Sequence, residues 1–296
     1  MQIKHLQNKS IDYALWDKCI SESINQLTYA YSWYLDIVSP NWEALVSENF
    51  DYIMPLPLKR KYKLPYIVQP KLTQQLGVFS NQVVDENIVQ LFINELPSFS
   101  YELNLNEHNF FQNAEIWPNY VLDLNQSYQQ IASKYSKNTK RNIEKATKMD
   151  LKVQYELSLD AFISFYYSAN KKYKSADQSF VKELINIGIS NEKMSLYAVL
   201  SAKNEIIAAL CLLHSTNRLT YLLPVSNEQG KSSSAMFLLI DKLIQNNVEK
   251  NCLFDFEGSR IEGIARFYKG FGAINQPYYI IKRFRPEFLI GKFNNK

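Results

Sequence analysis

Residues 205–273 read EIIAALCLLHSTNRLTYLLPVSNEQGKSSSAMFLLIDKLIQNNVEKNCLFDFEGSRIEGIARFYKGFGA, and their pattern decides the expected fold. Two apolar strand patterns come first, and the small-residue loop NEQGKSSS then leads into an apolar helix pattern. The strand LFDFE and the helix IEGIARFYKG complete the stretch. This order predicts an α+β domain in which a strand feeds a loop at the N-terminus of a helix.

The loop at residues 227–234 has the composition of an anion site. Unpaired N–H groups point outward at a helix N-terminus, where the helix dipole also favours negative charge. Gly230 would allow close backbone approach, Lys231 adds charge, and hydroxyl donors come from Ser232, Ser233 and Ser234. An ordinary capped helix start is the alternative, and these residues alone leave it open.

Composition narrows the class of protein. The chain of 296 residues suggests two domains or one large one, and 46% hydrophobic with 21% charged residues indicates a folded protein. A net charge of +4 is too small to demand a nucleic-acid partner. The three cysteines and three histidines are scattered, so we expect neither disulfides nor a metal site. With no long apolar run and no signal peptide, we expect no membrane span and a cytoplasmic location.

An internal echo indicates two related halves. With an offset of 154 residues, EALVSENFDYIMPLPL lies over YAVLSAKNEIIAALCL, and Pro70 lies over Pro224. Two unrelated β-meanders are the alternative, because the identity is low. The echo predicts an N-terminal domain of residues 1–125 and a C-terminal domain of residues 126–296.

Residues 127–149 show a helical pattern with a basic face. Spacings of three and four residues place five cations on that face: Lys134, Lys137, Arg141, Lys145 and Lys148. The face is either solvated or attracts an anionic acceptor or phosphates. Arg141 is the candidate for orienting the acceptor, because a guanidinium binds carboxylate or phosphate with two parallel hydrogen bonds.

Two carboxylates lie on the strand expected at 253–257. Alternation places Asp255 and Glu257 on one face, opposite Phe254 and Phe256. If that face lines the reaction site, Asp255 would contact substrate and Glu257 would take a proton from an acceptor ammonium, through water. A helix cap or an ion pair with Arg260 is the alternative.

The order of elements resembles the GNAT acyltransferase superfamily, whose pyrophosphate loop reads Gln/Arg-x-x-Gly-x-Gly/Ala before a long helix. Gln229 matches the first position, and Ser232 and Ser234 stand at the glycine positions. The resemblance implies that residues 229–234 hold the diphosphate of acyl-CoA. It also implies that backbone amides of strand 205–214, at Leu210 and Cys211, hold the acyl carbonyl.

A second match lies in the following helix, where the family carries Tyr-x-x-x-Gly-Phe. Residues 268–272 fit this pattern, and Ala273 replaces the Phe. The resemblance implies that Tyr268 protonates the leaving thiolate. A tyrosine packed on the last strand is the alternative.

Within this superfamily the chain is similar to the FemAB-like branch, which has tandem GNAT-like domains. Its marks are a basic helix opening the second domain, resembled by residues 135–153, and a Phe-Lys-x-x-Phe-Gly ending, resembled by residues 267–272. Fem-type peptidoglycan enzymes have Lys where Tyr268 stands. Lys269 follows on another helix face and is a candidate substrate contact. The resemblance covers most of the chain, more strongly after residue 127.

The expected fold class is α+β, with two tandem GNAT-like domains, each a mixed, mostly antiparallel sheet flanked by helices. The first would shape the acceptor side, and the second would bind the donor and catalyse the reaction. We expect direct N-acyl transfer from acyl-CoA to an amine of a small or peptide-like anionic acceptor. The alternatives are Fem-type aminoacyl transfer from tRNA, with salt-sensitive tRNA binding, and a non-catalytic ligand-binding protein on the same fold.

Overall fold

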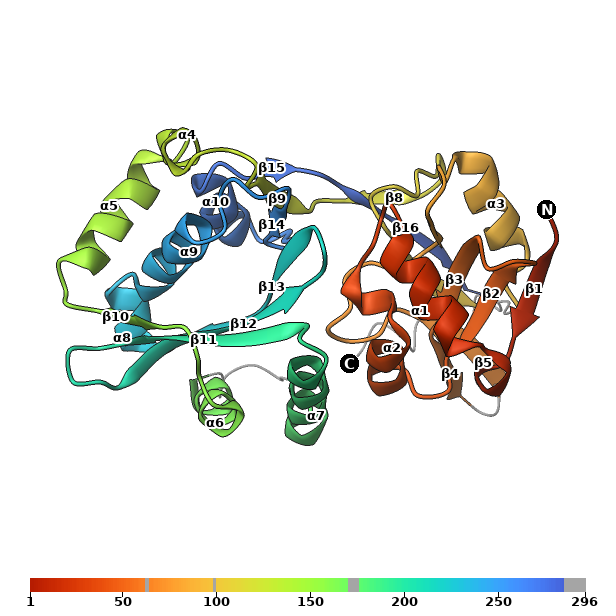
Figure 1. The fold of residues 1–296 in the computed structure, drawn as a ribbon, viewed down its shortest axis with the longest axis horizontal. Coiled ribbons are helices and arrows are strands. Elements are labelled where there is room, and N and C mark those ends of the chain that lie inside the picture. Colours follow the sequence, from red (N-terminus) through yellow and green to blue (C-terminus); the bar gives the residue numbers. More distant parts are fainter. Residues whose placement is uncertain (62–63, 98–99, 170–175, 285–296) are drawn as a thin grey trace. The chain divides into compact units, whose positions relative to one another are not determined.

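The computed structural model describes residues 1–61, 64–97, 100–169 and 176–284, which form two compact units (Figure 1). Unit 1 joins Met1–Trp117 to the C-terminal segment that begins at Pro277, and unit 2 is Pro118–Gln276. The boundary expected at residue 125 therefore lies earlier, and the last strand belongs to the first unit. Strand pairing between residues far apart in the sequence decides where the boundary lies and which unit holds the last strand. The periodicity of a single segment does not reveal such pairing.

The described residues of unit 1 form two sheets and three α-helices. The four-stranded sheet has the order β1 (Ile3–Leu6), β2 (Glu43–Ser47), β3 (Tyr52–Leu56), β6 (Phe79–Ser80). The five-stranded sheet has the order β4 (Leu58–Lys61), β5 (Leu64–Val68), β7 (Tyr101–Leu105), β16 (Tyr278–Arg283), β8 (Glu115–Trp117). The helices are α1 (Tyr13–Glu22), α2 (Ser32–Val38) and α3 (Glu86–Asn94), with short 3₁₀ turns at Asn8–Ser10 and Thr28–Ala30. Pro57, which has no N–H to donate, separates β3 from β4.

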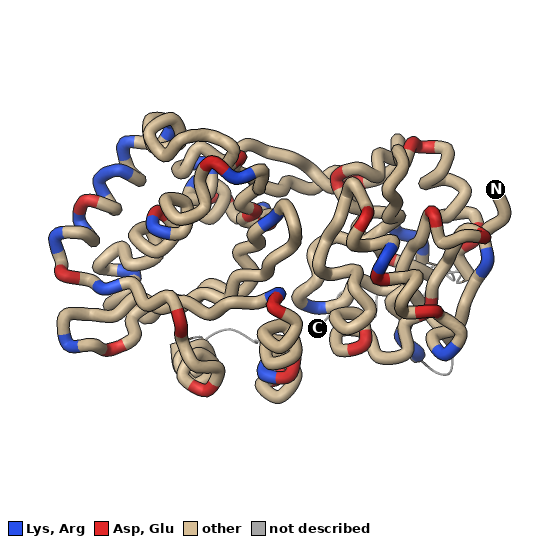
Figure 2. The backbone as a smooth tube through the Cα atoms, viewed as in Figure 1, with Lys and Arg blue, Asp and Glu red and all other residues tan. Residues whose placement is uncertain are grey.

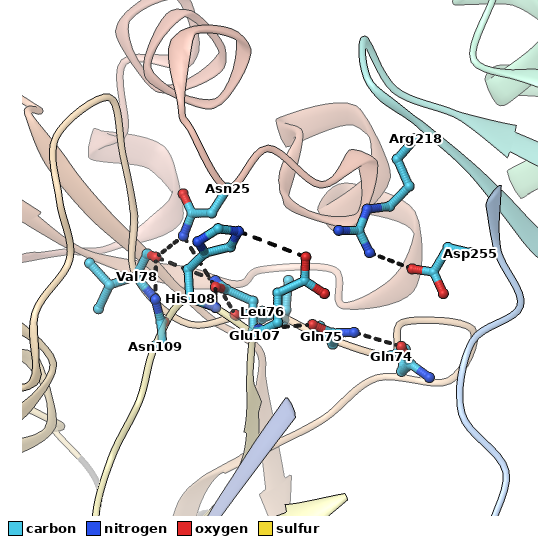
Figure 3. A network of polar contacts seen from close by, with 11 residues as sticks. Asn25, Gln74, Gln75, Leu76, Val78, Glu107, His108, Asn109, Arg218 and Asp255 are labelled. Atoms are coloured by element: carbon cyan, nitrogen blue, oxygen red, sulfur yellow. Dashed lines mark hydrogen bonds and ion pairs between the residues drawn. The ribbon is translucent and has the colours of Figure 1, made fainter. Parts of the chain in front are cut away.

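Buried amide side chains hold the loop before β6 in unit 1. The Val78 carbonyl accepts from Asn25 Nδ2 at 2.8 Å and from Asn109 Nδ2 at 3.0 Å (Figure 3). The Val78 N–H in turn donates to Asn109 Oδ1 at 2.6 Å. These amides satisfy backbone groups that lack a strand partner, so their role here is structural.

Unit 2 is built on one seven-stranded sheet. Its order is β10 (Lys152–Gln154), β11 (Met194–Leu200), β12 (Ile206–His214), β13 (Arg218–Ser226), β14 (Leu253–Asp255), β9 (Tyr120–Asp123), β15 (Ile274–Asn275). Among the described residues of this unit, only β13 and β14 pair in parallel, so the sheet is mixed and mostly antiparallel, as expected.

In the part of unit 2 that the structure describes, seven helices accompany this sheet: α4 (Tyr128–Ser133), α5 (Lys137–Thr147), α6 (Leu159–Ala169), α7 (Gln178–Ser190), α8 (Glu228–Ser232), α9 (Ala235–Gln245) and α10 (Glu262–Gly270). Figure 1 shows α6 and α7 on one face of the sheet and α9 and α10 on the other. None of the helices in the described residues combines the length and the apolar character that crossing a membrane requires.

The single helix expected over residues 127–149 is two helices. Ser127 caps α4 in a capping box with Gln130, and Ser136 caps α5 by accepting from the Thr139 N–H. A capping serine satisfies N–H groups that begin a new helix, so the chain restarts at Ser136. The expected stripe of five cations is interrupted, because Lys134 ends α4 and lies outside α5.

A buried carboxylate joins α9 to α4 and to the turn that follows α4. Asp241 of α9 is 2% exposed, and its Oδ1 accepts from the hydroxyls of Tyr128 at 2.9 Å and Tyr135 at 3.1 Å. Its Oδ2 accepts from Gln245 Nε2 at 2.8 Å. Burial raises the pKa of the Asp241 carboxyl, although hydrogen bonds from the two phenols lower it.

Asp241→Asn is expected to be at least as stable as the wild type at pH 7. Because the folded-state pKa of Asp241 is raised, its contribution to stability is fullest below the unfolded-state pKa and is lost as pH rises through the folded value. The free energy of unfolding of the wild type minus that of the variant should therefore decrease as the pH is raised from 4 to 7. Urea unfolding of both proteins measures this difference. An increase with pH contradicts the assignment.

Candidate active site

The parallel strands β13 and β14 part after three residue pairs. Their register runs from Arg218 with Leu253 to Thr220 with Asp255, and β13 then continues to Ser226. The chain after Asp255 stays with β9 instead, where the Phe256 N–H donates to the Tyr120 carbonyl at 2.9 Å. Among the described residues, β13 beyond Thr220 has a strand neighbour on its β12 side only. Its free edge offers backbone groups to a ligand.

A β-bulge lies on this free stretch of β13. Cys211 pairs with Leu223 and Leu212 pairs with Tyr221, so Leu222 is the extra residue on β13. Bulges redirect backbone groups and are frequent next to active sites.

The acyl-carbonyl role expected for Leu210 and Cys211 does not fit their position. Both residues are fully buried in β12, which pairs with β11 on one side and β13 on the other. Their backbone groups thus lie within the sheet and face no open edge. Burial also raises the pKa of the Cys211 thiol, which suppresses the thiolate. The strand with the free edge is β13, one place along the sheet.

Tyr268 of α10 lies in an aromatic cluster. Its ring centroid is 5.0 Å from that of Phe256 and 6.1 Å from those of Tyr120 and Tyr221. Burial raises the pKa of the Tyr268 hydroxyl well above its ordinary value, and the charges of Glu257 and Asp255 raise it further. In the described part of the chain this hydroxyl has no hydrogen-bond partner. The phenol therefore stays protonated, with its O–H available to a ligand.

Lys269, the expected substrate contact, lies beside the same cluster. Its ammonium is 5.4 Å from the centroid of the Tyr120 ring, and its side chain is exposed. A cation held against an aromatic face can still meet an anionic ligand.

The two carboxylates expected on one face are placed differently. β14 ends at Asp255, which is 3% exposed and ion-paired to Arg218, with 2.6 Å between Nη1 and Oδ2 (Figure 3). Asp255 is thus occupied within the protein, contrary to the substrate contact expected for it. Glu257 is half-buried in the left-handed region, with φ of 58°, and its charge acts on Tyr268.

Arg218 was missed by sequence reasoning. The only signal was a basic residue at the start of a strongly apolar strand pattern, which in sequence looks like an ordinary strand end.

The expected diphosphate loop is mostly the short helix α8. The Asn227 side chain caps it by accepting from the Gly230 N–H at 2.8 Å, and the Lys231 N–H donates to the Asn227 carbonyl at 3.0 Å. The N–H groups of Ser233 and Ser234 also bond within this segment, to the carbonyls of Gln229 and Lys231. These amides are not open to a diphosphate.

The side chains of this segment are engaged as well. The hydroxyls of Ser232 and Ser233 donate to backbone carbonyls one turn earlier, and Lys231 is ion-paired to Glu228 at 2.8 Å. Gly230 is buried against β12, where an added Cβ would overlap the carbonyl oxygen of Ile207. Gly230 therefore serves close packing, and the cradle expected over residues 229–234 is not formed.

The start of α9 leaves two backbone amides unpaired, and the first residue of the helix, Ala235, is fully buried. Ser234 has φ of 59°, its hydroxyl donates to Asn142 Oδ1 at 2.7 Å, and its carbonyl accepts from the Phe237 N–H. Among the described residues, the N–H groups of Ala235 and Met236 find no hydrogen-bond partner. Unpaired amides at a helix start favour negative charge.

The basic face of α5 lies beside this helix start. Lys145 donates from Nζ to the Ser232 carbonyl at 2.6 Å, and Asn142 contacts Ser234. Arg141 is exposed one turn before Lys145 and donates to Asn138 Oδ1 at 3.0 Å. Figure 2 shows Lys and Arg recurring along α5. The sequence of the same helix also includes Glu144. Exposed cations next to free amides are suited to phosphate.

A family model described as the FemAB family matches residues 57–187. The chain therefore resembles the FemAB family over a little less than half of its length. Among solved structures, FemX is 9% identical with a TM-score of 0.70, and the match covers 98% of this chain and 99% of that one. No curated protein matches the FemAB-like chain in sequence.

Two further structures share the fold, and one of them is a tandem GNAT protein. A tandem GNAT protein from the clavulanic acid biosynthesis pathway is 9% identical with a TM-score of 0.53, covering 95% and 98% of the two chains. The C-terminal domain of a putative lysylphosphatidylglycerol synthetase from Agrobacterium fabrum is 8% identical with a TM-score of 0.59, covering 95% and 94%. At such identities the likeness shows the fold, which confirms the expected α+β tandem GNAT-like class. Together with the FemAB match it supports a transferase.

Proposed function

We propose that this FemAB-like protein transfers an activated acyl group from a phosphate-bearing carrier to an amine. The observation that carries the proposal is the Tyr268 hydroxyl, a protonated and unpartnered phenol among the described residues, with the Glu257 carboxylate acting on it. Acyl transfer to an amine requires one group to accept the proton of the attacking nitrogen and another to donate to the leaving atom. Glu257 and Tyr268 would fill these two roles.

In this mechanism the parted edge of β13 would hold the acyl carbonyl, because backbone N–H groups there lack a strand partner in the described residues. Donors aimed at the developing oxyanion lower the barrier strongly. Glu257 would take the ammonium proton through water, and Tyr268 would donate to the leaving oxygen or sulfur. Direct transfer is favoured over a covalent intermediate, because the Cys211 thiol is buried with a raised pKa.

Aminoacyl-tRNA is the carrier that we favour. The amides expected to cradle a CoA diphosphate are used within α8, whereas exposed cations along α5 suit an RNA backbone. The raised pKa of Tyr268 also matches the alkoxide of an ester better than a thiolate, whose conjugate thiol has a pKa of about 8.5.

Acyl-CoA is the second candidate carrier. It is favoured by the match of Gln229 and Tyr268 to the GNAT pattern. The acceptor would be a small or peptide-like amine, and either carrier would place the reaction in the cytoplasm.

Arg141→Ala is expected to weaken tRNA binding and to reduce its salt dependence. Each phosphate contact adds about one unit to the slope of log affinity against log salt, so the slope should fall by about one. Filter binding of charged tRNA over a salt series measures this slope. Lys182→Ala is the matched control, because Lys182 of α7 is also exposed and is paired to Asp160, away from α5.

The carriers are separated by titrating acetyl-CoA in a calorimeter under the same conditions. Binding of acetyl-CoA without binding of tRNA would transfer the proposal to the second candidate. Binding of neither carrier would leave the fold without the proposed function.

A further inference from the structure

A buried ion pair stands next to the proposed catalytic groups in unit 2. Arg218 is the first residue of β13 and Asp255 is the last residue of β14, and their side chains are 7% and 4% exposed. Burying two charges is costly, and a well-packed apolar pair is often equally stable. Stability alone is therefore a weak reason for this pair, and its contacts indicate a second role.

The second carboxylate oxygen of Asp255 holds the backbone of Glu257. Asp255 Oδ1 accepts from the Glu257 N–H at 2.8 Å. Glu257 has φ of 58°, a left-handed conformation that is unfavourable for a residue with a Cβ and persists only when its surroundings enforce it. The Glu257 carbonyl also accepts from the Tyr120 N–H at 3.1 Å, so the bend is held on both sides.

The bend sets where the Glu257 carboxylate lies. It falls where the chain leaves β13, directly after Phe256, whose ring is 5.0 Å from that of Tyr268. An extended Glu257 would continue the strand and carry its carboxylate to another position.

We propose that Arg218 is a positioning residue, which fixes the Asp255 carboxylate so that Asp255 holds Glu257 in its left-handed bend beside Tyr268. The inference rests on the proposed roles of Glu257 and Tyr268 in acyl transfer. The bend itself can be measured without any activity, so the two proposals can fail separately.

Two double variants separate positioning from plain stability. Arg218→Met with Asp255→Asn, and Arg218→Met with Asp255→Leu, both remove the two charges, so neither leaves a buried charge unpaired. The asparagine keeps an oxygen for the Glu257 N–H, and the leucine, of similar size, has none. The readouts are hydrogen exchange of the Glu257 amide by NMR, kcat with aminoacyl-tRNA, and the Kd for that donor.

The asparagine variant is expected to keep a protected Glu257 amide and a kcat within about tenfold of the wild type. The leucine variant is expected to exchange this amide about a hundredfold faster and to lose about a hundredfold in kcat, with donor Kd unchanged, because a small displacement of a catalytic group costs that much. Equal exchange rates, or equal kcat values, in the two folded variants would overturn the inference.

Arg218→Lys decides the matter if circular dichroism shows the leucine variant unfolded. It keeps the charge but replaces a planar fork by a point charge, so kcat should fall about tenfold with donor Kd unchanged. A wild-type kcat would overturn the inference. If the wild type transfers from neither carrier, the proposed function fails, and the exchange rates alone decide whether Asp255 holds the bend.

Discussion

Tyr268→Phe is expected to lower kcat by about a hundredfold or more while leaving donor Kd and stability nearly unchanged. The substitution removes only the hydroxyl, and that hydroxyl has no hydrogen-bond partner among the described residues. The folded protein thus loses no internal hydrogen bond, and the aromatic contacts with Phe256 and Tyr221 remain. Steady-state transfer assays with both carriers, together with thermal unfolding, measure these effects.

Tyr221→Phe is the matched control. Tyr221 on β13 carries a second buried phenol, whose pKa burial also raises strongly, and its ring contacts that of Tyr268. Its removal should change kcat by only a few-fold. A large loss in Tyr221→Phe with none in Tyr268→Phe would move the role to Tyr221. Full activity in both variants would contradict a proton donor in this cluster, and an inactive wild type that still binds ligand is the result expected of a non-catalytic binding protein.

Gly230→Ala is expected to destabilise the protein by about 2 kcal/mol or more. An added Cβ would overlap the carbonyl oxygen of Ile207. Because Ile207 belongs to a strand in the middle of the sheet, the overlap can be relieved only if α8 shifts away from β12. The free energy of unfolding from urea titration measures this effect.

Gly263→Ala provides the comparison, because a Cβ there meets nothing within 4 Å. Its stability should stay within about 1 kcal/mol of the wild type, since alanine is the better helix former. The pair also separates two roles for Gly230. If Gly230→Ala keeps its stability but loses donor affinity, Gly230 approaches a phosphate as the GNAT resemblance implies, and the packing role is wrong.

The candidate site was predictable from sequence only in part. Tyr268 and Glu257 were proposed from motif and strand pattern, and they stay candidates: burial, and then the charge of Glu257, raises the pKa of the Tyr268 hydroxyl. Leu210 and Cys211 lie on β12, which is paired on both sides, whereas the open edge is on β13, because a sequence pattern does not say which of two apolar strands neighbours β14. Arg218 carried no motif, and its role depends on Asp255, which lies 37 residues further along the chain.

The sequence by itself determined the elements whose causes are local. Alternation, helical periodicity and capping residues act within about ten residues, so α9 and the strands β12 and β13 could be read directly, together with the FemAB-like pattern of α10. Only the tertiary structure decided that the last strand joins unit 1, that α8 closes over its own amides against β12, and that Asp255 is taken by Arg218. Each of these three features depends on contacts between groups far apart in the chain. Such contacts form only when strands pair and charges are buried together, so no local sequence pattern predicts them.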